Sequence, residues 1–206
     1  MPVRFQHEQL ENCIYFITFT CIKWKCLFEL SGAYDAVYKW FDSLYKSKVR
    51  VNGYVIMPNH VHALLSFPEM PKSLNTVIGN GKRFIAYDII NSLELKKEIQ
   101  LLEELYGLVK KVERKKGQRH KVFKDSFDAE QCYTRKFLLQ KLDYIHKNPV
   151  SKRWQLVEDY TQYKYSSAGF YEKGIVSYDK ILHVSEIWQI KQPGVSPSVY
   201  FYDILR

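Results

Sequence analysis

The chain has 206 residues, a formal net charge of +9, 46% apolar residues and 16% aromatic residues. This composition is typical of a folded globular protein and excludes a disordered one, and the excess of positive charge favours a polyanionic partner. No apolar run approaches the length of a membrane span, and the first residues contain no signal-peptide segment. We therefore expect a cytoplasmic, nucleoid-associated protein with no membrane partner.

The first part of the chain predicts a strand, a helix and a second strand. Residues Ile14–Ile22 are apolar on both faces, which indicates a central strand covered on both sides. Ser31 is a candidate N-cap for an amphipathic helix over Gly32–Lys46. Gly53 indicates a bulge, or a close approach by another backbone, within the strand Val49–Met57. We expect four side chains of this strand to share one face: Val49, Val51, Val55 and Met57.

Two histidines one residue apart, His60 and His62, begin the next predicted strand, after a Pro58-Asn59 turn signal. In a strand the side chains at i and i+2 share a face, so both imidazoles point the same way. The alternate positions are all apolar and should face a core: Val61, Ala63, Leu65 and Phe67. Paired imidazoles suit divalent transition metals but need a third ligand from elsewhere, and an arbitrary H-x-H pair is more often structural.

Helices and a short edge strand are predicted next. Ser73 is a candidate cap for a helix that contains Gly79 and Gly81, and each glycine costs a helix roughly 1 kcal/mol. That cost indicates that another segment approaches the backbone there. The helical pattern continues over Glu94–Val109, and Val122–Ala129 reads as a short edge strand.

Most of the net charge lies in the segment Lys110–Lys124, where eight cations against one acid, Glu113, give +7. Charge runs are usually solvated loops. The functional alternative is a flexible arm that follows a phosphate backbone. Its DNA-contacting side chains would be Lys110, Lys111, Arg114, Lys115, Lys116, Arg119, Lys121 and Lys124.

The last strongly periodic helix is predicted over Thr134–Lys147, and Pro149 ends it. Tyr144 and Asn148 are four residues apart, so one turn brings them to the same side. His146 falls on another face, where we expect a surface or DNA-contacting residue.

The element order predicts an α+β fold with an antiparallel sheet, helices on one face, and the last helix over the histidine face. That arrangement would bring a phenol, two imidazoles and an amide oxygen together. A hard cation held there would polarise a phosphodiester oxygen, and the phenolate of Tyr144 would be placed to attack phosphorus. Because such a site leaves coordination positions open, we expect Mg²⁺ or Mn²⁺.

Three segments, MPNHVHALLSF, LDYIHKNPV and KYSSAGFY, together resemble the HUH single-tyrosine transposases, in particular the REP-associated tyrosine transposase branch. The resemblance runs from Ile14 to Tyr171 in the same order. It implies a ferredoxin-like or RRM-like fold and single-stranded DNA, often beside a hairpin, as substrate. It also implies cleavage that leaves a 5′-phosphotyrosine and a free 3′-hydroxyl. By position it implies metal ligation by His60, His62 and Asn148, with Tyr144 as the nucleophile.

Residues 1–171 would form this domain, with a helical and basic insertion at about 96–118 that compact relatives lack. Residues 172–206 would be a tail that packs on or extends the domain, and the aromatic-rich sequence from Ser151 onward is expected to pack back. The tyrosine helix is swapped between subunits in some relatives and not in others. Both a monomer and a homodimer therefore remain open.

Three alternatives remain at the level of sequence. The chain could be a non-catalytic nucleic-acid-binding module that keeps the fold. A metal-dependent hydrolase that uses water would need an acidic base near the histidines, and Asn59 cannot serve as one. Tyr133 is a rival nucleophile, but no asparagine follows it at the spacing of Asn148 from Tyr144.

Overall fold

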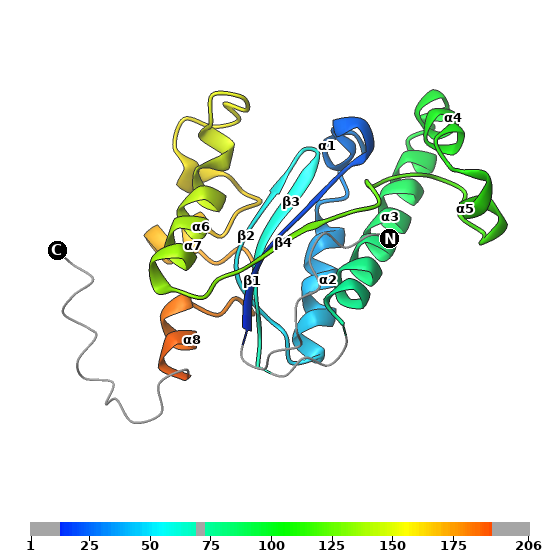
Figure 1. Cartoon of the computed structure of the whole chain (residues 1–206). Helices are drawn as coiled ribbons and strands as arrows, with labels where there is room; N and C mark the ends of the chain where they lie inside the picture. Colours follow the sequence, from blue (N-terminus) through cyan, green and yellow to red (C-terminus); the bar gives the residue numbers. More distant parts are fainter. Residues whose placement is uncertain (1–12, 69–72, 191–206) are drawn as a thin grey trace.

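The computed structural model describes residues 13–68 and 73–190. A four-stranded sheet lies between two layers of helices, with the strand order β2-β3-β1-β4 and antiparallel pairing throughout (Figure 1). The strands are β1 (Cys13–Thr20), β2 (Arg50–Met57), β3 (His60–Phe67) and β4 (Asp128–Gln131). This confirms the predicted α+β class.

Helices lie over both faces of the sheet (Figure 1). The first layer contains α2 (Asp35–Lys46) and α3 (Leu74–Leu95), and the opposite layer contains α6 (Arg135–Lys147). The remaining elements are η1 (Ile22–Trp24), α1 (Leu27–Ser31), α4 (Ile99–Gly107), α5 (Lys111–Lys115), η2 (Asn148–Val150), η3 (Tyr160–Gln162), α7 (Ala168–Lys173) and α8 (Val184–Ile190).

Apolar side chains bury both faces of the sheet. In β1, Tyr15 and Ile17 lie in the core beneath α2 and α3, whereas Ile14 and Phe16 lie in the smaller core beneath α6. The central strand expected at Ile14–Ile22 is therefore confirmed, with its end at Thr20. Full burial of one such side chain contributes about 1.5–3 kcal/mol relative to exposure.

A bulge in β2 lies between Val51 and Gly53 and changes which side chains face which core. Val51 faces α2 and α3, but Val55 and Met57 lie beneath α6. The expected single face of four side chains is therefore wrong, because one extra residue reverses the alternation. A Cβ on Gly53 would lie 2.6 Å from Cδ1 of Leu142, so this glycine lets α6 approach the sheet.

Helix boundaries differ from the sequence prediction at Ser31. This residue ends α1 instead of starting the next helix: its hydroxyl donates to the carbonyl of Leu27, 2.6 Å away. Gly32 follows at φ +73° as the left-handed C-cap, a conformation that glycine adopts without strain. The predicted helix then begins at Asp35.

The glycines of α3 have different surroundings. A Cβ on Gly81 would lie 2.4 Å from Nε1 of Trp40 on α2, whereas a Cβ on Gly79 would have no atom within 4 Å. The expected close approach is thus confirmed at Gly81 alone. Further along, the predicted helix over Glu94–Val109 is interrupted before α4, where Lys97 has φ +58°.

The edge strand begins later than predicted. Hydrogen bonding places β4 at Asp128–Gln131, and Phe123 forms only an isolated bridge with Cys21. On the opposite edge, the chain after α6 returns to β2. The Tyr171 hydroxyl donates to the carbonyl of Asn52, and the Leu182 amide donates to the carbonyl of Val51 at 2.9 Å. Within the described ranges, no helix combines the length and apolarity that a bilayer crossing requires.

Candidate active site

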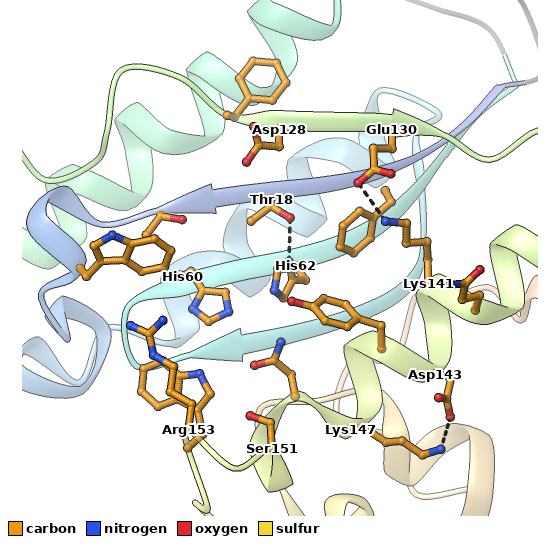
Figure 2. A pocket seen from close by; sticks show the side chains of 18 of the residues that line it. Thr18, His60, His62, Asp128, Glu130, Lys141, Asp143, Lys147, Ser151 and Arg153 are labelled. Carbon is orange, nitrogen blue, oxygen red and sulfur yellow. Dashed lines mark hydrogen bonds and ion pairs between the residues drawn. The ribbon is translucent and has the colours of Figure 1, made fainter. Parts of the chain in front are cut away.

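A cleft of about 1310 Å³ opens on the sheet face beneath α6. Its floor comes from β1 and β3, including Thr18, His60 and His62, and its wall from α6 and the turn that follows, including Tyr144 and Asn148. The four residues that the sequence nominated for metal binding and nucleophilic attack therefore share one cleft. Figure 2 shows the histidines on the sheet between Thr18 and the segment that carries Arg153.

The two imidazoles lie side by side with ring centroids 4.6 Å apart. Each has its Nδ1 in a hydrogen bond: His60 with Oδ1 of Asn59 at 2.6 Å, and His62 with Oγ1 of Thr18 at 2.7 Å. Thr18 is paired with His62 across the β1–β3 ladder, so strand register delivers its hydroxyl to the ring. Such partners fix the orientation of a metal-ligating histidine.

Asn59 also sets the tautomer of His60. Its Nδ2 donates to the carbonyl of Trp24 at 2.9 Å, which turns Oδ1 toward the imidazole. An amide oxygen only accepts, so Nδ1 of His60 carries the proton and Nε2 keeps its lone pair. Asn59, the turn residue that cannot act as an acidic base, therefore leaves Nε2 of His60 free to accept.

Tyr144 lies on α6 with its ring 5.2 Å from the ring of His62, edge-on at 68°. Its side chain is half exposed to the cleft, and its ring edge also meets Phe16 at 6.0 Å. The helix α6 begins at Arg135, one residue after its predicted start, because Thr134 is its N-cap. The Thr134 hydroxyl accepts from the Phe137 amide at 3.2 Å.

His146 anchors α6 from the other side and is not at the surface, contrary to the sequence expectation. It is buried, and its Nε2 lies 2.9 Å from Oγ of Ser167. Ser167 Oγ also accepts from the Tyr54 amide on β2, at 2.9 Å. The KYSS segment therefore ties α6 to the sheet, and burial lowers the pKa of His146 to about 4.

Asn148 follows α6 as its C-cap and keeps helical backbone angles, φ −56° and ψ −45°. Pro149 then continues the chain as the 3₁₀ turn η2. The side chain of Asn148 is buried and its Oδ1 has no hydrogen-bond partner among the described residues. Nε2 of His62 is likewise buried with no hydrogen-bond partner among the described residues. Buried polar atoms without partners are uncommon and costly, and an ion or a water bound between these two would satisfy them.

These residues fit a divalent metal. Burial, with the nearby charge of Arg153, lowers the pKa of His60 to about 4, and burial lowers that of His62 far below its usual value. Both rings are therefore neutral at pH 7, as metal ligation requires. In the described ranges no group of three histidine, cysteine or acidic side chains could hold a metal ion, so a third protein ligand would have to be of another kind, such as the amide oxygen of Asn148.

Three carboxylates also line the cleft, Asp128, Glu130 and Asp143, and Asp143 is paired with Lys147. Asp128 pairs with Thr18 across β4–β1, two strands from His62, which corresponds to about 10 Å at the usual strand spacing. Glu130 is in a salt bridge with Lys141, 2.8 Å from Nζ to Oε1 (Figure 2). Within residues 13–68 and 73–190, the His62 ring forms a hydrogen bond with Thr18 and none with a carboxylate that could act as the base of a water-using hydrolase.

The basic segment is folded and not an extended arm. Part of it forms α5, and Lys121 is buried, with its ammonium paired to Glu113 and Asp125. Lys124 lines the cleft. The other predicted DNA contacts are exposed: Lys110, Lys111, Arg114, Lys115, Lys116 and Arg119. Lys121 is therefore a structural cation, whereas the rest of the set faces solvent or the cleft.

Sequence reasoning missed several cleft residues. Thr18 in β1 was a usable signal, because it shares a strand face with Phe16, and a polar residue inside an apolar strand indicates a functional face. Lys141 lies one turn before Tyr144, with Nζ 4.5 Å from the Phe16 ring centroid. Arg153 gave no such signal, since only the fold brings it to the cleft.

The fold and cleft define an α+β protein with two histidines on a sheet and a tyrosine on a crossing helix. The structure is similar to that of a REP-associated tyrosine transposase bound to a REP hairpin, with a TM-score of 0.56 over 84% of this chain and 87% of that one. The two sequences are 15% identical, so the similarity establishes a shared fold. No protein-family model and no curated protein matches the sequence.

Proposed function

We propose that this protein breaks and rejoins single-stranded DNA near hairpins by transesterification on Tyr144. The observation that carries the proposal is the approach of the Tyr144 ring to His62 in a cleft that also holds two buried polar atoms with no partner among the described residues, Nε2 of His62 and Oδ1 of Asn148. A fold shared with a hairpin-bound transposase supports DNA as the partner. The net charge of +9 is consistent with it.

In the proposed reaction the Tyr144 phenol loses its proton and its Oη bonds to phosphorus. The bond from phosphorus to the 3′ oxygen breaks, and that oxygen takes up a proton and leaves as a 3′-hydroxyl. The product is a 5′-phosphotyrosine, which conserves the energy of the broken phosphodiester, and a 3′-hydroxyl rejoins by the reverse steps. Mg²⁺ or Mn²⁺ held by His60, His62 and Asn148 would polarise a phosphate oxygen.

The test is covalent adduct formation on DNA taken from around the protein's own gene, with hairpin-flanked single strands and Mg²⁺. Wild-type protein should give a denaturation-resistant protein–DNA band. Tyr144→Phe should give none while binding the same DNA with similar affinity, since stacking and phosphate contacts do not need that hydroxyl. Tyr133→Phe is the matched control and should remain active, because Tyr133 does not line the cleft.

Two results would reject the proposal. An adduct on Tyr144→Phe places the nucleophile elsewhere. Binding without an adduct on any strand offered leaves the non-catalytic binding module as the function.

A further inference from the structure

Trp24 is a large apolar side chain that the fold leaves about half exposed at one end of the cleft. It ends η1, and both Trp24 (φ +58°) and Lys23 (φ +49°) have left-handed backbone conformations, which residues other than glycine adopt at an energetic cost. The Trp24 carbonyl accepts from Asn59 and its amide donates to the carbonyl of Cys21, 3.2 Å away. The ring is therefore held in the cleft by a strained, hydrogen-bonded turn.

Two cations lie over this ring and come from distant parts of the chain. Nζ of Lys124 is 3.8 Å from the Trp24 ring centroid, and Cζ of Arg153 is 5.1 Å from it. Neither forms a salt bridge with a carboxylate in the described part of the chain. This sets them apart from Lys141 and Lys147 in the same cleft, which are paired with Glu130 and Asp143. At the Trp24 end of the cleft, these two cations are therefore not held by a carboxylate at salt-bridge distance among the described residues.

Asn59 and Trp154 connect the Trp24 end of the cleft to His60. Asn59 hydrogen bonds both to the Trp24 carbonyl and to His60, so one side chain connects the two sites. Trp154, over which Arg153 also lies, has its ring 5.8 Å from that of His60. In Figure 2, Arg153 lies at the His60 end of the cleft and Lys141 at the other. A strand with one phosphate at Tyr144 that continues past His60 would therefore reach the Trp24 end of the cleft.

We propose that Trp24, Lys124 and Arg153 form a nucleotide subsite in which a base of the strand bound at Tyr144 stacks on the indole. Lys124 and Arg153 turn from the ring onto adjacent phosphates and leave an indole face to the base. An exposed aromatic ring flanked by unpaired cations is the combination that binds single strands without sequence preference. The subsite rests on the proposed function, because it takes the same DNA strand.

The test is a double-mutant cycle that removes the base and the ring in turn. Two fluorescently labelled 12-nucleotide strands are compared by anisotropy, one of dT and one abasic with the same backbone. All proteins carry Tyr144→Phe, so binding is measured without chemistry in Mg²⁺. Trp24→Ala should weaken binding of the dT strand about 5- to 150-fold, the usual range for one stacked base, and leave the abasic strand unchanged. Trp24→Phe should retain part of the dT preference.

Phe84 provides the matched control. It is an exposed ring with a cation over it, Cζ of Arg83 at 5.0 Å, but it lies on α3, which packs on the other face of the sheet. Phe84→Ala should change neither affinity. Lys124→Gln and Arg153→Gln should each lower the salt dependence by about 0.7 log units per log salt, whereas Trp24→Ala should leave it unchanged.

Equal loss of affinity for both strands in Trp24→Ala, or no loss for either, would overturn the subsite. These outcomes are separate from the fate of the enzyme proposal. A dT preference that depends on Trp24 supports the subsite even where Tyr144 forms no adduct. An adduct formed by wild-type protein, with a dT preference that survives Trp24→Ala, overturns the subsite alone.

Discussion

Tyr144 meets the ring of His62 edge-on, 5.2 Å between centroids, although the two residues belong to different layers of the fold. The contact depends on the path of α6 across the sheet. Leu142 packs where Gly53 has no side chain, and His146 is tied to Ser167. The geometry of the cleft is therefore fixed by residues that take no part in the proposed chemistry.

Thr18 should control metal affinity through His62. Thr18→Val removes the hydroxyl 2.7 Å from Nδ1 of His62 and keeps the side-chain shape. Loss of such an outer hydrogen bond usually costs 10- to 100-fold in affinity, and we expect a loss of about that size for Mn²⁺, measured by calorimetry. His62→Ala should abolish binding. Thr20→Val is the control, since no described hydrogen bond joins the Thr20 side chain to a histidine. Equal Mn²⁺ affinity in Thr18→Val and wild type would refute the role of Thr18 in orienting His62.

The exposed part of the basic segment should contribute to the salt dependence of DNA binding. Neutralising Lys115, Lys116 and Arg119 with glutamine should lower the slope by up to about 2 log units per log salt, about 0.7 for each phosphate contact with a single strand. Binding should weaken similarly for all sequences. Lys46→Gln, on α2, controls for removal of a remote charge. An unchanged slope in the triple variant would show that the segment is only solvated.

Two glycines of α3 should respond to alanine with opposite signs. Gly79→Ala meets no atom within 4 Å, so the better helix propensity should raise the free energy of unfolding by about 0.5–1 kcal/mol. Gly81→Ala would place Cβ 2.4 Å from Nε1 of the buried Trp40 and should lower the free energy of unfolding by about 1–3 kcal/mol. Urea denaturation measures both. A gain in stability from Gly81→Ala would contradict the close packing of α2 on α3.

Stability should fall with pH below about 6.5 in part because of His146. Its folded pKa is lowered to about 4 by burial, with the Asp143 charge acting in the opposite direction. As the pH falls, the unfolded chain takes up the proton first, near pH 6.5, so unfolding becomes easier until the folded protein is protonated near pH 4. The loss from this residue is at most about 1.4 kcal/mol per pH unit.

Urea denaturation in EDTA, from pH 7.5 to 4.5, measures the contribution of His146 to the free energy of unfolding without metal. The difference between wild type and His146→Gln should shrink as the pH falls, because only wild type loses the stability of the buried neutral ring. His183→Gln, at a partly exposed histidine, provides the comparison. Parallel pH curves for wild type and His146→Gln would contradict the burial of a neutral imidazole.

The sequence by itself determined the features that depend on neighbours along the chain. Alternation placed His60 and His62 on one face of β3, and helical spacing placed Tyr144 and Asn148 on one side of α6. Periodicity and capping are local, because strand and helix geometry repeat over two and 3.6 residues. The resemblance of three short segments added the order of these parts and the expected fold.

Tertiary structure alone decided how those parts meet. The bulge at Gly53 reversed the faces of β2. Lys121 is buried beside Glu113, and His146 is buried beside Ser167, and both partners lie on other elements or loops. Thr18 reaches His62 across 44 residues of sequence, and Arg153 reaches Trp24 across a longer span. Such pairings depend on strand register and helix docking, which the spacing of residues within one element does not encode.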